Sequence, residues 1–290
     1  MSAKTKKEKV KSEVKMIDKI IGIIGCGSMG SAIIERLKDK YKVFVYDAQD
    51  EKVKVVAGVN VAASAQDLIA NSDIIILAVK PQDLGILMAA VMNQVKGKLV
   101  ISIAAGIKTS FIEKILGEVS VIRAMPNIGA KIGHSVTCLC KGSFAKDIDL
   151  VIARELFRNI GTTHSLSEEM MDGVTAISGS GPGYYFEMID KNITMYESDY
   201  KKFSGDFSLD LKDAAMSIGF DEATARFLAN STVIASDLLL KITRKPAAEL
   251  RDMVASPKGT TQAGLEILRR GGKLIEAVQA AYKRAQELSK

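Results

Sequence analysis

A glycine-rich segment near the start of the chain has the residue types and spacing that hold a phosphate group. Ile21-Gly22-Ile23-Ile24 leads directly into Gly25-Cys26-Gly27-Ser28-Met29-Gly30, which is G-x-G-x-x-G between a predicted strand and a predicted helix. In this context the first glycine permits a tight turn, the second lets the backbone approach a pyrophosphate, and the third lets helix and strand pack closely. The N-terminus of the following helix presents unpaired N–H groups to the phosphates. The segment therefore predicts a dinucleotide site, with a purely structural glycine turn as the alternative.

Asp47 stands where such a site uses an acid. It ends the next predicted strand, 22 residues after Gly25, and its carboxylate can accept hydrogen bonds from the adenosine ribose hydroxyls. The same carboxylate would repel the 2′-phosphate of NADPH. Lys52 and Lys54 offset part of that repulsion, but no arginine occurs from Ala48 to Gly58. We therefore expect NAD(H) to be the preferred cofactor and NADP(H) to be possible.

Short apolar runs that alternate with helical stretches predict the elements that position these residues. The runs are nearly continuous, which is typical of strands buried on both faces of a parallel sheet. The predicted strands are Lys19–Ile24, Lys42–Tyr46, Asp73–Val79, Lys98–Ile103, Val119–Ala124 and Ser135–Leu139. A helix is predicted near Ile148–Ile160, and almost everything after Glu168 has helical spacing. The fold class is thus α/β, with a doubly wound sheet over residues 19–166 and a helical domain over residues 167–290.

Composition excludes several classes of protein. The formal net charge is +6, but residues 1–19 carry +4 of it, so the rest has no basic footprint for nucleic acid. We expect residues 1–18 to be a disordered basic tail. The longest apolar runs fall far short of the roughly 20 residues that cross a bilayer, so no membrane contact is expected. The 3 cysteines and 2 histidines have no metal-ligand spacing, so no metal is expected, and the chain is expected to be cytoplasmic.

Aromatic residues within the helical half recur at helical spacing. Tyr196, Tyr200, Phe203 and Phe207 follow steps of four, three and four, which places them on one face if the segment is helical. A packed stripe is favoured over a ligand cage.

Six ordered motifs from about Lys19 to the C-terminus resemble those of the 1-pyrroline-5-carboxylate reductase family. Besides the glycine-rich segment, they are Ala78-Val79-Lys80-Pro81, Ser102-Ile103-Ala104-Ala105-Gly106, Arg123-Ala124-Met125-Pro126-Asn127, Ser178-Gly179-Ser180-Gly181-Pro182, and Asp252 through Ser256-Pro257-Lys258-Gly259-Thr260-Thr261. The resemblance implies a Rossmann-type domain followed by an all-α dimerisation domain, and reduction of a cyclic imine acid to proline by hydride from NADH or NADPH. It also implies a homodimer or a multiple of dimers.

The same resemblance implies the site residues. Contacts to the cofactor are expected from Gly25, Cys26, Gly27, Ser28, Met29, Gly30, Asp47, Ala78, Val79, Lys80, Pro81, Ala104, Ala105, Met125 and Asn127. Contacts to the substrate are expected from Ser256, Gly259, Thr260, Thr261 and Glu168. Thr261, which matches the residue that touches the imine nitrogen, and Lys80, beside the nicotinamide, are the expected catalytic residues. The alternatives are a helix N-cap for Thr260 or Thr261, a solvated loop lysine for Lys80 and core packing for Met125.

Residues 256–261 also suggest an anion site without the resemblance. They precede an apolar helical run, Ala263–Leu268, so the N–H groups of Gly259, Thr260 and Thr261 can point at an anion such as the substrate carboxylate.

Departures from the family pattern leave two other functions open. Lys258, Met253, Gly183 and Gly129 replace residues that are usual in the family, and about twenty residues around Asn192–Leu211 appear inserted. Lys258, beside the expected carboxylate site, favours a reductase for a larger ring or for a substrate with a second carboxylate. The altered motif and the insertion favour a non-catalytic dinucleotide-binding scaffold.

Overall fold

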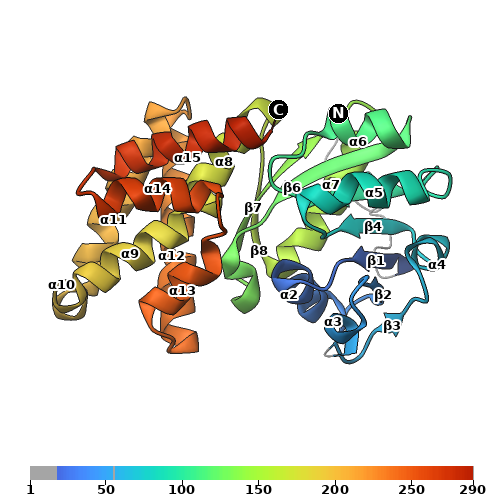
Figure 1. Ribbon diagram of the computed structural model, residues 1–290, viewed down its shortest axis with the longest axis horizontal. Coiled ribbons are helices and arrows are strands. Elements are labelled where there is room, and N and C mark those ends of the chain that lie inside the picture. Colours follow the sequence, from blue (N-terminus) through green and yellow to red (C-terminus); the bar gives the residue numbers. More distant parts are fainter. Residues whose placement is uncertain (1–17, 55, 290) are drawn as a thin grey trace, which may run out of the picture.

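The chain divides into a sheet-forming part and a helical part (Figure 1). The computed structural model describes residues 18–54 and 56–289, so the predicted basic tail lies outside the described residues except for Asp18. The last strand ends at Ser165, and every later element among the described residues is helical. The change from sheet to helices falls where the sequence predicts a domain boundary.

Eight strands form one sheet in the order β3-β2-β1-β4-β5-β6-β7-β8. They are β1 (Ile20–Ile24), β2 (Lys42–Tyr46), β3 (Asn60–Val61), β4 (Ile74–Leu77), β5 (Leu99–Ser102), β6 (Ser120–Met125), β7 (Ser135–Lys141) and β8 (Gly161–Ser165). The first six strands are parallel to their neighbours, β7 is antiparallel to β6, and β8 is parallel to β7. Strand order reverses at β1, between β2 and β4, and a ligand crevice opens at the carboxyl ends of strands at such a point.

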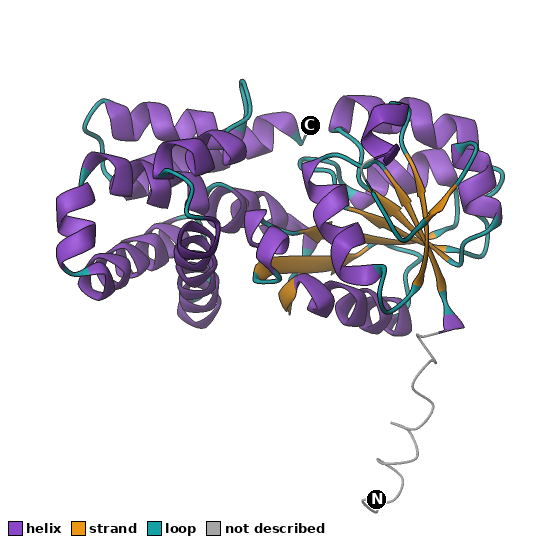
Figure 2. Ribbon diagram, turned by 90° about the horizontal axis from the view of Figure 1, so that it is seen from below, coloured by secondary structure: helices purple, strands orange, loops and turns teal. Residues whose placement is uncertain are grey.

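Helices cover both faces of the sheet (Figure 2). One face packs against α2 (Ser28–Leu37) and α7 (Asp147–Phe157), and the other against α4 (Ala65–Ala70), α5 (Pro81–Val91) and α6 (Thr109–Leu116). The short α3 (Asp50–Lys54) follows β2. Because side chains alternate along a strand, Ile74 and Ile76 join one core and Ile75 and Leu77 the other. The prediction of strands buried on both faces is confirmed.

Two strands escaped the sequence analysis. β3 has only two residues, both exposed, and β8 reads Gly-Thr-Thr-His-Ser with no apolar side chain. Both are edge strands, whose residues need not be hydrophobic on either face, so their pattern carries no strand signal.

The helical part packs around its own core. Its elements are α8 (Met171–Val174), a π-helical turn (Thr175–Gly179), α9 (Gly181–Lys191), α10 (Ile193–Ser198), α11 (Tyr200–Ser217), α12 (Glu222–Thr243), α13 (Ala247–Val254), α14 (Thr260–Arg269) and α15 (Leu274–Leu288). None of the helices in residues 18–54 and 56–289 is long and apolar enough to span a membrane.

The predicted aromatic stripe forms, but on two helices. Asp199 separates α10 from α11 and caps the second by accepting a hydrogen bond from the N–H of Lys202 at 3.0 Å. Tyr196 still meets Phe203, with ring centroids 5.6 Å apart, and its hydroxyl donates to Asp237 on α12 at 2.6 Å. Of the four aromatic residues, only Tyr200 is exposed. The inserted segment is therefore anchored to the helical core.

Buried polar contacts join the two parts. Arg123 on β6 is 1% exposed and forms ion pairs with Glu168 at 3.6 Å and Asp172 at 3.4 Å. The hydroxyl of Ser289, after α15, donates to the carboxylate of Asp172 at 2.6 Å. A buried guanidinium requires such partners because its desolvation is costly.

Candidate active site

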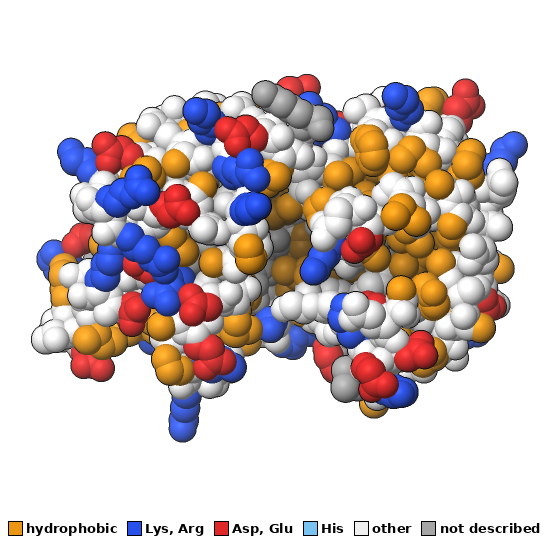
Figure 3. Space-filling view, in the orientation of Figure 1, with side chains coloured by type: hydrophobic (Ala, Val, Ile, Leu, Met, Phe, Trp, Pro, Cys, Tyr) orange, Lys and Arg blue, Asp and Glu red, His pale blue; other side chains and the backbone are white. Residues whose placement is uncertain are grey.

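A cavity of about 270 Å³ lies where the sheet edge meets the helical part, and Figure 3 shows the surface hollowed between the two halves. It is lined by Ser28, Met29, Ala105, Met125, Pro126, Asn127, Ile128, Lys131, Thr175, Gly179, Ser180, Met253, Val254, Ser256, Thr260 and Thr261. These residues come from the start of α2, from the segments after β5 and β6, and from the helical part between α8 and α14. The cavity thus brings the predicted cofactor side and the predicted substrate side together.

The three glycines of the loop have three different environments. Gly25 has φ +106°, and a Cβ there would lie 2.5 Å from the carbonyl oxygen of Ala78. A Cβ on Gly30 would lie 2.0 Å from the carbonyl oxygen of Gly25, so helix and strand approach only without it. A Cβ on Gly27 would meet no atom within 4 Å, so this position faces open space. Turn, close packing and open approach are what a pyrophosphate loop requires.

The carboxylate of Asp47 is attached to this loop. Its Oδ2 accepts a hydrogen bond from the N–H of Cys26 at 2.7 Å, and its Oδ1 accepts one from the N–H of Gln49 at 2.9 Å. Burial, followed by the charge of Asp47, raises the pKa of the Cys26 thiol to about 11, and the charge of Lys52 lowers it by a smaller amount. Cys26 is therefore neutral at pH 7, and its backbone N–H, not its thiol, serves the loop.

A second hollow, of about 380 Å³, opens beside Asp47. It is lined by Tyr46, Asp47, Asp50, Val53, Lys54, Val56, Val61, Ala62 and Ala63. Its walls are the carboxyl end of β2, the helix α3 and the segment after β3. An apolar hollow with a carboxylate at its rim fits an adenosine, because the ring needs apolar walls and the ribose needs an acceptor.

The predicted residues after β4 and β5 differ in their access to the cavity. Ala105 lines it, whereas Ala104 is buried below. Ala78, Val79 and Pro81 lie at the carboxyl end of β4 and the start of α5 but are not among the lining residues. Lys80 is the N-cap residue of α5, makes no side-chain cap hydrogen bond and is exposed. The structure does not bring Lys80 to the cavity.

Met125 and Asn127 follow β6, and both line the cavity. The side chain of Asn127 is 2% exposed, and its Nδ2 donates to the carbonyl of Ser178 at 3.2 Å. Its Oδ1 accepts hydrogen bonds from the N–H groups of Gly129 and Val136, each at 3.2 Å. The polar atoms of Asn127 therefore bind protein groups and join β6 to the helical part.

Three hydroxyl groups meet on the substrate side. Thr261 Oγ1 donates to Ser180 Oγ at 3.1 Å, and Ser180 Oγ lies 2.9 Å from Thr260 Oγ1. Ser180 is fully buried and Thr261 is 5% exposed. The N-cap of α14 is Gly259, with no side-chain cap hydrogen bond, so neither threonine acts as the cap. The alternative interpretation of these threonines as caps is wrong.

Residues 256–260 form the turn that starts α14. The N–H of Gly259 donates to the carbonyl of Ser256 at 3.0 Å, so this N–H is not available to an anion, contrary to the expectation from the sequence. The N–H groups of Thr260 and Thr261 are in the first turn of α14 and have no intrahelical acceptor. Ser256 lines the cavity beside them. These donors can bind a carboxylate.

Glu168 does not lie at this cavity. Its carboxylate accepts hydrogen bonds from the N–H and the Oγ1 of Thr109, both at 2.7 Å, and pairs with Arg123. Thr109 is the first residue of α6, so Glu168 satisfies the N-terminus of a helix in the other part of the chain. The acid chosen from the sequence has a structural position here.

The sequence analysis assigned no site role to Ser180 or to Lys131. Ser180 belongs to a quoted motif, but only the structure shows that its hydroxyl meets Thr261. Lys131 is the one charged side chain among the residues that line the cavity. It lies in a 3-10 turn, Ile128–Ile132, and its position two turns of chain beyond Met125 gave no sequence signal.

Comparison with known proteins assigns both halves. Residues 207–288 match the description "Pyrroline-5-carboxylate reductase dimerisation", and residues 20–106 match "NADP oxidoreductase coenzyme F420-dependent". Pyrroline-5-carboxylate reductases of Synechocystis and of Methanosarcina acetivorans are each 34% identical, and each alignment covers 93% of this chain and 98% of the relative.

Solved structures agree in fold. The enzyme from Streptococcus pyogenes is 30% identical with a TM-score of 0.62, covering 94% of this chain and 98% of that one. The Plasmodium falciparum pyrroline carboxylate reductase, whose structure has NADP bound, is 26% identical with a TM-score of 0.64, covering 95% and 100%. With a glycine loop, a switch-point cavity and relatives over nearly the full length, the chain belongs to the pyrroline-5-carboxylate reductase family, the oxidoreductases that reduce 1-pyrroline-5-carboxylate to L-proline with a pyridine nucleotide.

Proposed function

We propose that the reduction takes place in the 270 Å³ cavity, with the imine held between Thr261 and the segment that contains Ala105 and Met125. The carrying observation is that the hydroxyls of Thr261, Ser180 and Thr260 and the first turn of α14 open into the same cavity as the ends of β5 and β6. In the reaction the imine nitrogen is protonated, hydride from the nicotinamide adds to the imine carbon, and the C=N π electrons become the nitrogen lone pair of the amine. An iminium is already electrophilic, so positioning supplies much of the catalysis.

The substrate carboxylate is proposed to bind at the start of α14. The N–H groups of Thr260 and Thr261 and the Ser256 hydroxyl are the donors, and the helix dipole adds a partial positive charge. This placement leaves the ring nitrogen near Thr261 Oγ1. A hydroxyl that accepts from the iminium N–H stabilises the charged form that receives hydride.

The cofactor is proposed to extend from this cavity to the hollow at Asp47, with its pyrophosphate over Gly27. NADH is the proposed preferred form, because the Asp47 carboxylate is held at the rim by the N–H of Cys26. A 2′-phosphate there would meet a like charge, and unit charges about 4 Å apart repel by ~4 kcal/mol at an effective dielectric near 20. Lys54 is paired with Glu51 at 2.7 Å, which leaves Lys52 as the nearer counter-charge in sequence.

Assembly as a homodimer or a multiple of dimers is proposed from the match of residues 207–288 to the dimerisation domain. Ile234 and Ile242 on α12 are each 58% exposed and lie two helical turns apart. Apolar side chains of this size are expected to be covered in an oligomer. Light scattering on the purified protein tests this. A cytoplasmic location stays a prediction that cell fractionation would test.

The competing functions lack support from the site. Lys258 is exposed and is not among the residues that line the cavity, so no diacid contact supports a different imine. The decisive experiment is reduction of 1-pyrroline-5-carboxylate followed by loss of NADH absorbance, with a larger-ring imine acid in parallel and rescue of a proline auxotroph. Turnover of the larger ring alone would replace the proposed substrate. Cofactor binding without turnover of either imine would indicate a scaffold.

A further inference from the structure

Both branches of the Thr261 side chain are fixed by the same turn of α9. Its hydroxyl donates to Ser180 Oγ at 3.1 Å, and Ser180 is the N-cap residue of α9. Its methyl group, Cγ2, lies 2.5 Å from the point that a Cβ on Gly183 would occupy. Gly183 is the third residue of the same helix. The methyl group therefore packs on bare backbone that any larger residue would cover.

This arrangement determines what the hydroxyl can do. Because Thr261 donates its hydrogen to Ser180, its oxygen lone pairs remain to accept from another group. Ser180 is fully buried and is itself within 2.9 Å of Thr260, so its hydroxyl has no access to solvent. A rotation of Thr261 about its Cα–Cβ bond would break the contact with Ser180 or drive the methyl group into a neighbour.

We infer that Ser180 and Gly183 are positioning residues that hold Thr261 in the one rotamer that presents its hydroxyl oxygen to the imine nitrogen. The inference rests on the proposed role of Thr261 in the reaction. Ser180 acts through a hydrogen bond and Gly183 through the absence of a side chain, so the two act independently on the same torsion.

The test uses the full-length enzyme and four variants: Gly183→Ala, Ser180→Ala, Thr261→Ser and the double variant Gly183→Ala with Thr261→Ser. Gly183→Ala is expected to lower kcat/KM roughly 10- to 100-fold, mainly in kcat, because misplacement of about 1 Å has that effect. Thr261→Ser removes the methyl group that the new Cβ would strike. The double variant is therefore expected to be at least several-fold more active than Gly183→Ala.

Gly205→Ala is the matched control, because a Cβ at that helical glycine of α11 would meet no atom within 4 Å. It is expected to leave kcat/KM and the affinity for cofactor unchanged. Wild-type kcat/KM in Gly183→Ala, or no gain in the double variant, would overturn the inference. If Gly183→Ala does not fold, Ser180→Ala decides: it is expected to lower kcat/KM with little change in cofactor affinity, and a wild-type value would overturn the role of Ser180.

Crystal structures of the wild type and Gly183→Ala separate this inference from the proposed function. A rotated Thr261 in the variant supports the positioning role even if the wild type reduces neither imine. An unchanged Thr261 overturns it whatever the activity.

Discussion

The carboxylate of Asp47 accepts a hydrogen bond from the backbone N–H of Cys26 at 2.7 Å, and this contact connects the end of β2 to the phosphate loop after β1. One acidic side chain thus both orders the loop and faces the hollow beside it. Loop geometry and cofactor choice therefore depend on the same residue.

Asp47→Ser is expected to shift cofactor preference. The wild type is expected to have a kcat/KM at least roughly tenfold higher with NADH than with NADPH, because a charged acceptor contributes ~1.5–3 kcal/mol toward the ribose hydroxyl. Serine removes the charge and should bring the two values to near equality or reverse them. Steady-state kinetics with both cofactors measures this, with Glu51→Gln as a control. A wild type that uses both cofactors equally contradicts the assignment.

Thr261→Val is expected to lower kcat/KM roughly 10- to 150-fold. The change keeps the shape of the side chain but removes a hydrogen bond to a charged group, worth ~1.5–3 kcal/mol. Thr162→Val, on the edge strand β8, is the matched control and should retain activity. Near-normal kcat/KM together with a lower melting temperature would show that Thr261 is only structural.

Glu168→Gln is expected to reduce stability and to leave KM for the imine unchanged. The variant weakens the contacts to Thr109 and leaves buried Arg123 with Asp172 as its one ion-pair partner among the described residues. Loss of such a contact costs about 1–3 kcal/mol in unfolding free energy. Denaturant titration and steady-state kinetics measure the two quantities. A several-fold rise in KM with normal stability would restore the substrate role inferred from the sequence.

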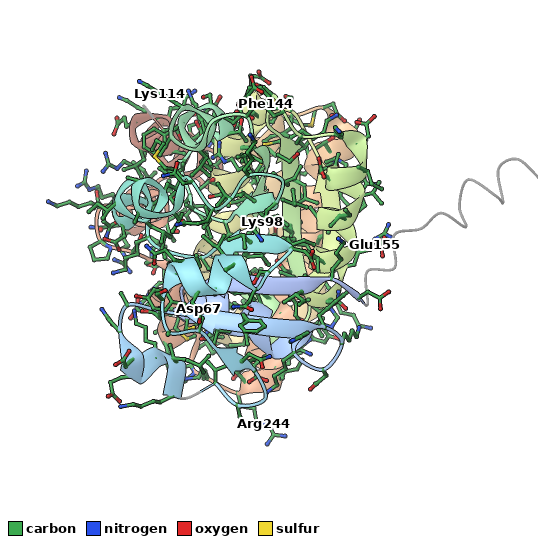
Figure 4. The ribbon with its side chains drawn as sticks, turned by 90° about the vertical axis from the view of Figure 1, so that its right-hand side faces the viewer. Asp67, Lys98, Lys114, Phe144, Glu155 and Arg244 are labelled. Carbon is green, nitrogen blue, oxygen red and sulfur yellow. The ribbon has the colours of Figure 1, made fainter. Side chains whose placement is uncertain are left out.

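Lys258→Gly is expected to stabilise the protein by up to ~1 kcal/mol. Lys258 has φ 59°, a left-handed conformation that only glycine adopts without cost, although glycine also loses more entropy on folding. Arg244→Gly is the matched variant, because Arg244 has φ 54° and Figure 4 shows it at the far end of the molecule. Both should raise the melting temperature, and neither should change KM. A higher KM in Lys258→Gly alone would reveal a contact with the substrate carboxylate.

Lys131→Gln is expected to raise KM for the anionic imine several-fold with a smaller effect on kcat. Lys131 is the one cation that lines the cavity, and a positive charge at the mouth raises the local concentration of an anion. The difference from wild type should shrink as salt increases. Lys96→Gln, an exposed lysine outside the cavity, should show no such change. A salt-independent KM equal to that of the wild type would contradict the expectation.

The sequence was most informative where burial repeats along the chain. Ile74–Leu77 is apolar at every position because both faces of β4 are covered, and α15 begins and ends at the predicted Leu274 and Leu288. The edge strand β8 carries no such pattern, since its polar side chains are only half-buried.

The candidate site was less predictable because side-chain direction depends on tertiary contacts. Motif position suggested cofactor contact for Asn127 and substrate contact for Glu168, yet their polar atoms bind Ser178, and Thr109 with Arg123. Ser180 and Thr261 are 81 residues apart in the chain, and no local pattern reports that their hydroxyls meet.

The polar seam between the two halves has a consequence for how ligands enter. Asn127 with Ser178, Glu168 with Thr109, and Arg123 with Asp172 all cross from the sheet to the helical part. A hinge motion that opened the halves would break these bonds together and expose a buried guanidinium, which is costly. We therefore expect catalysis in a preformed gap, with traffic through its mouth and without domain closure, so that the radius of gyration in solution stays the same when cofactor and proline bind.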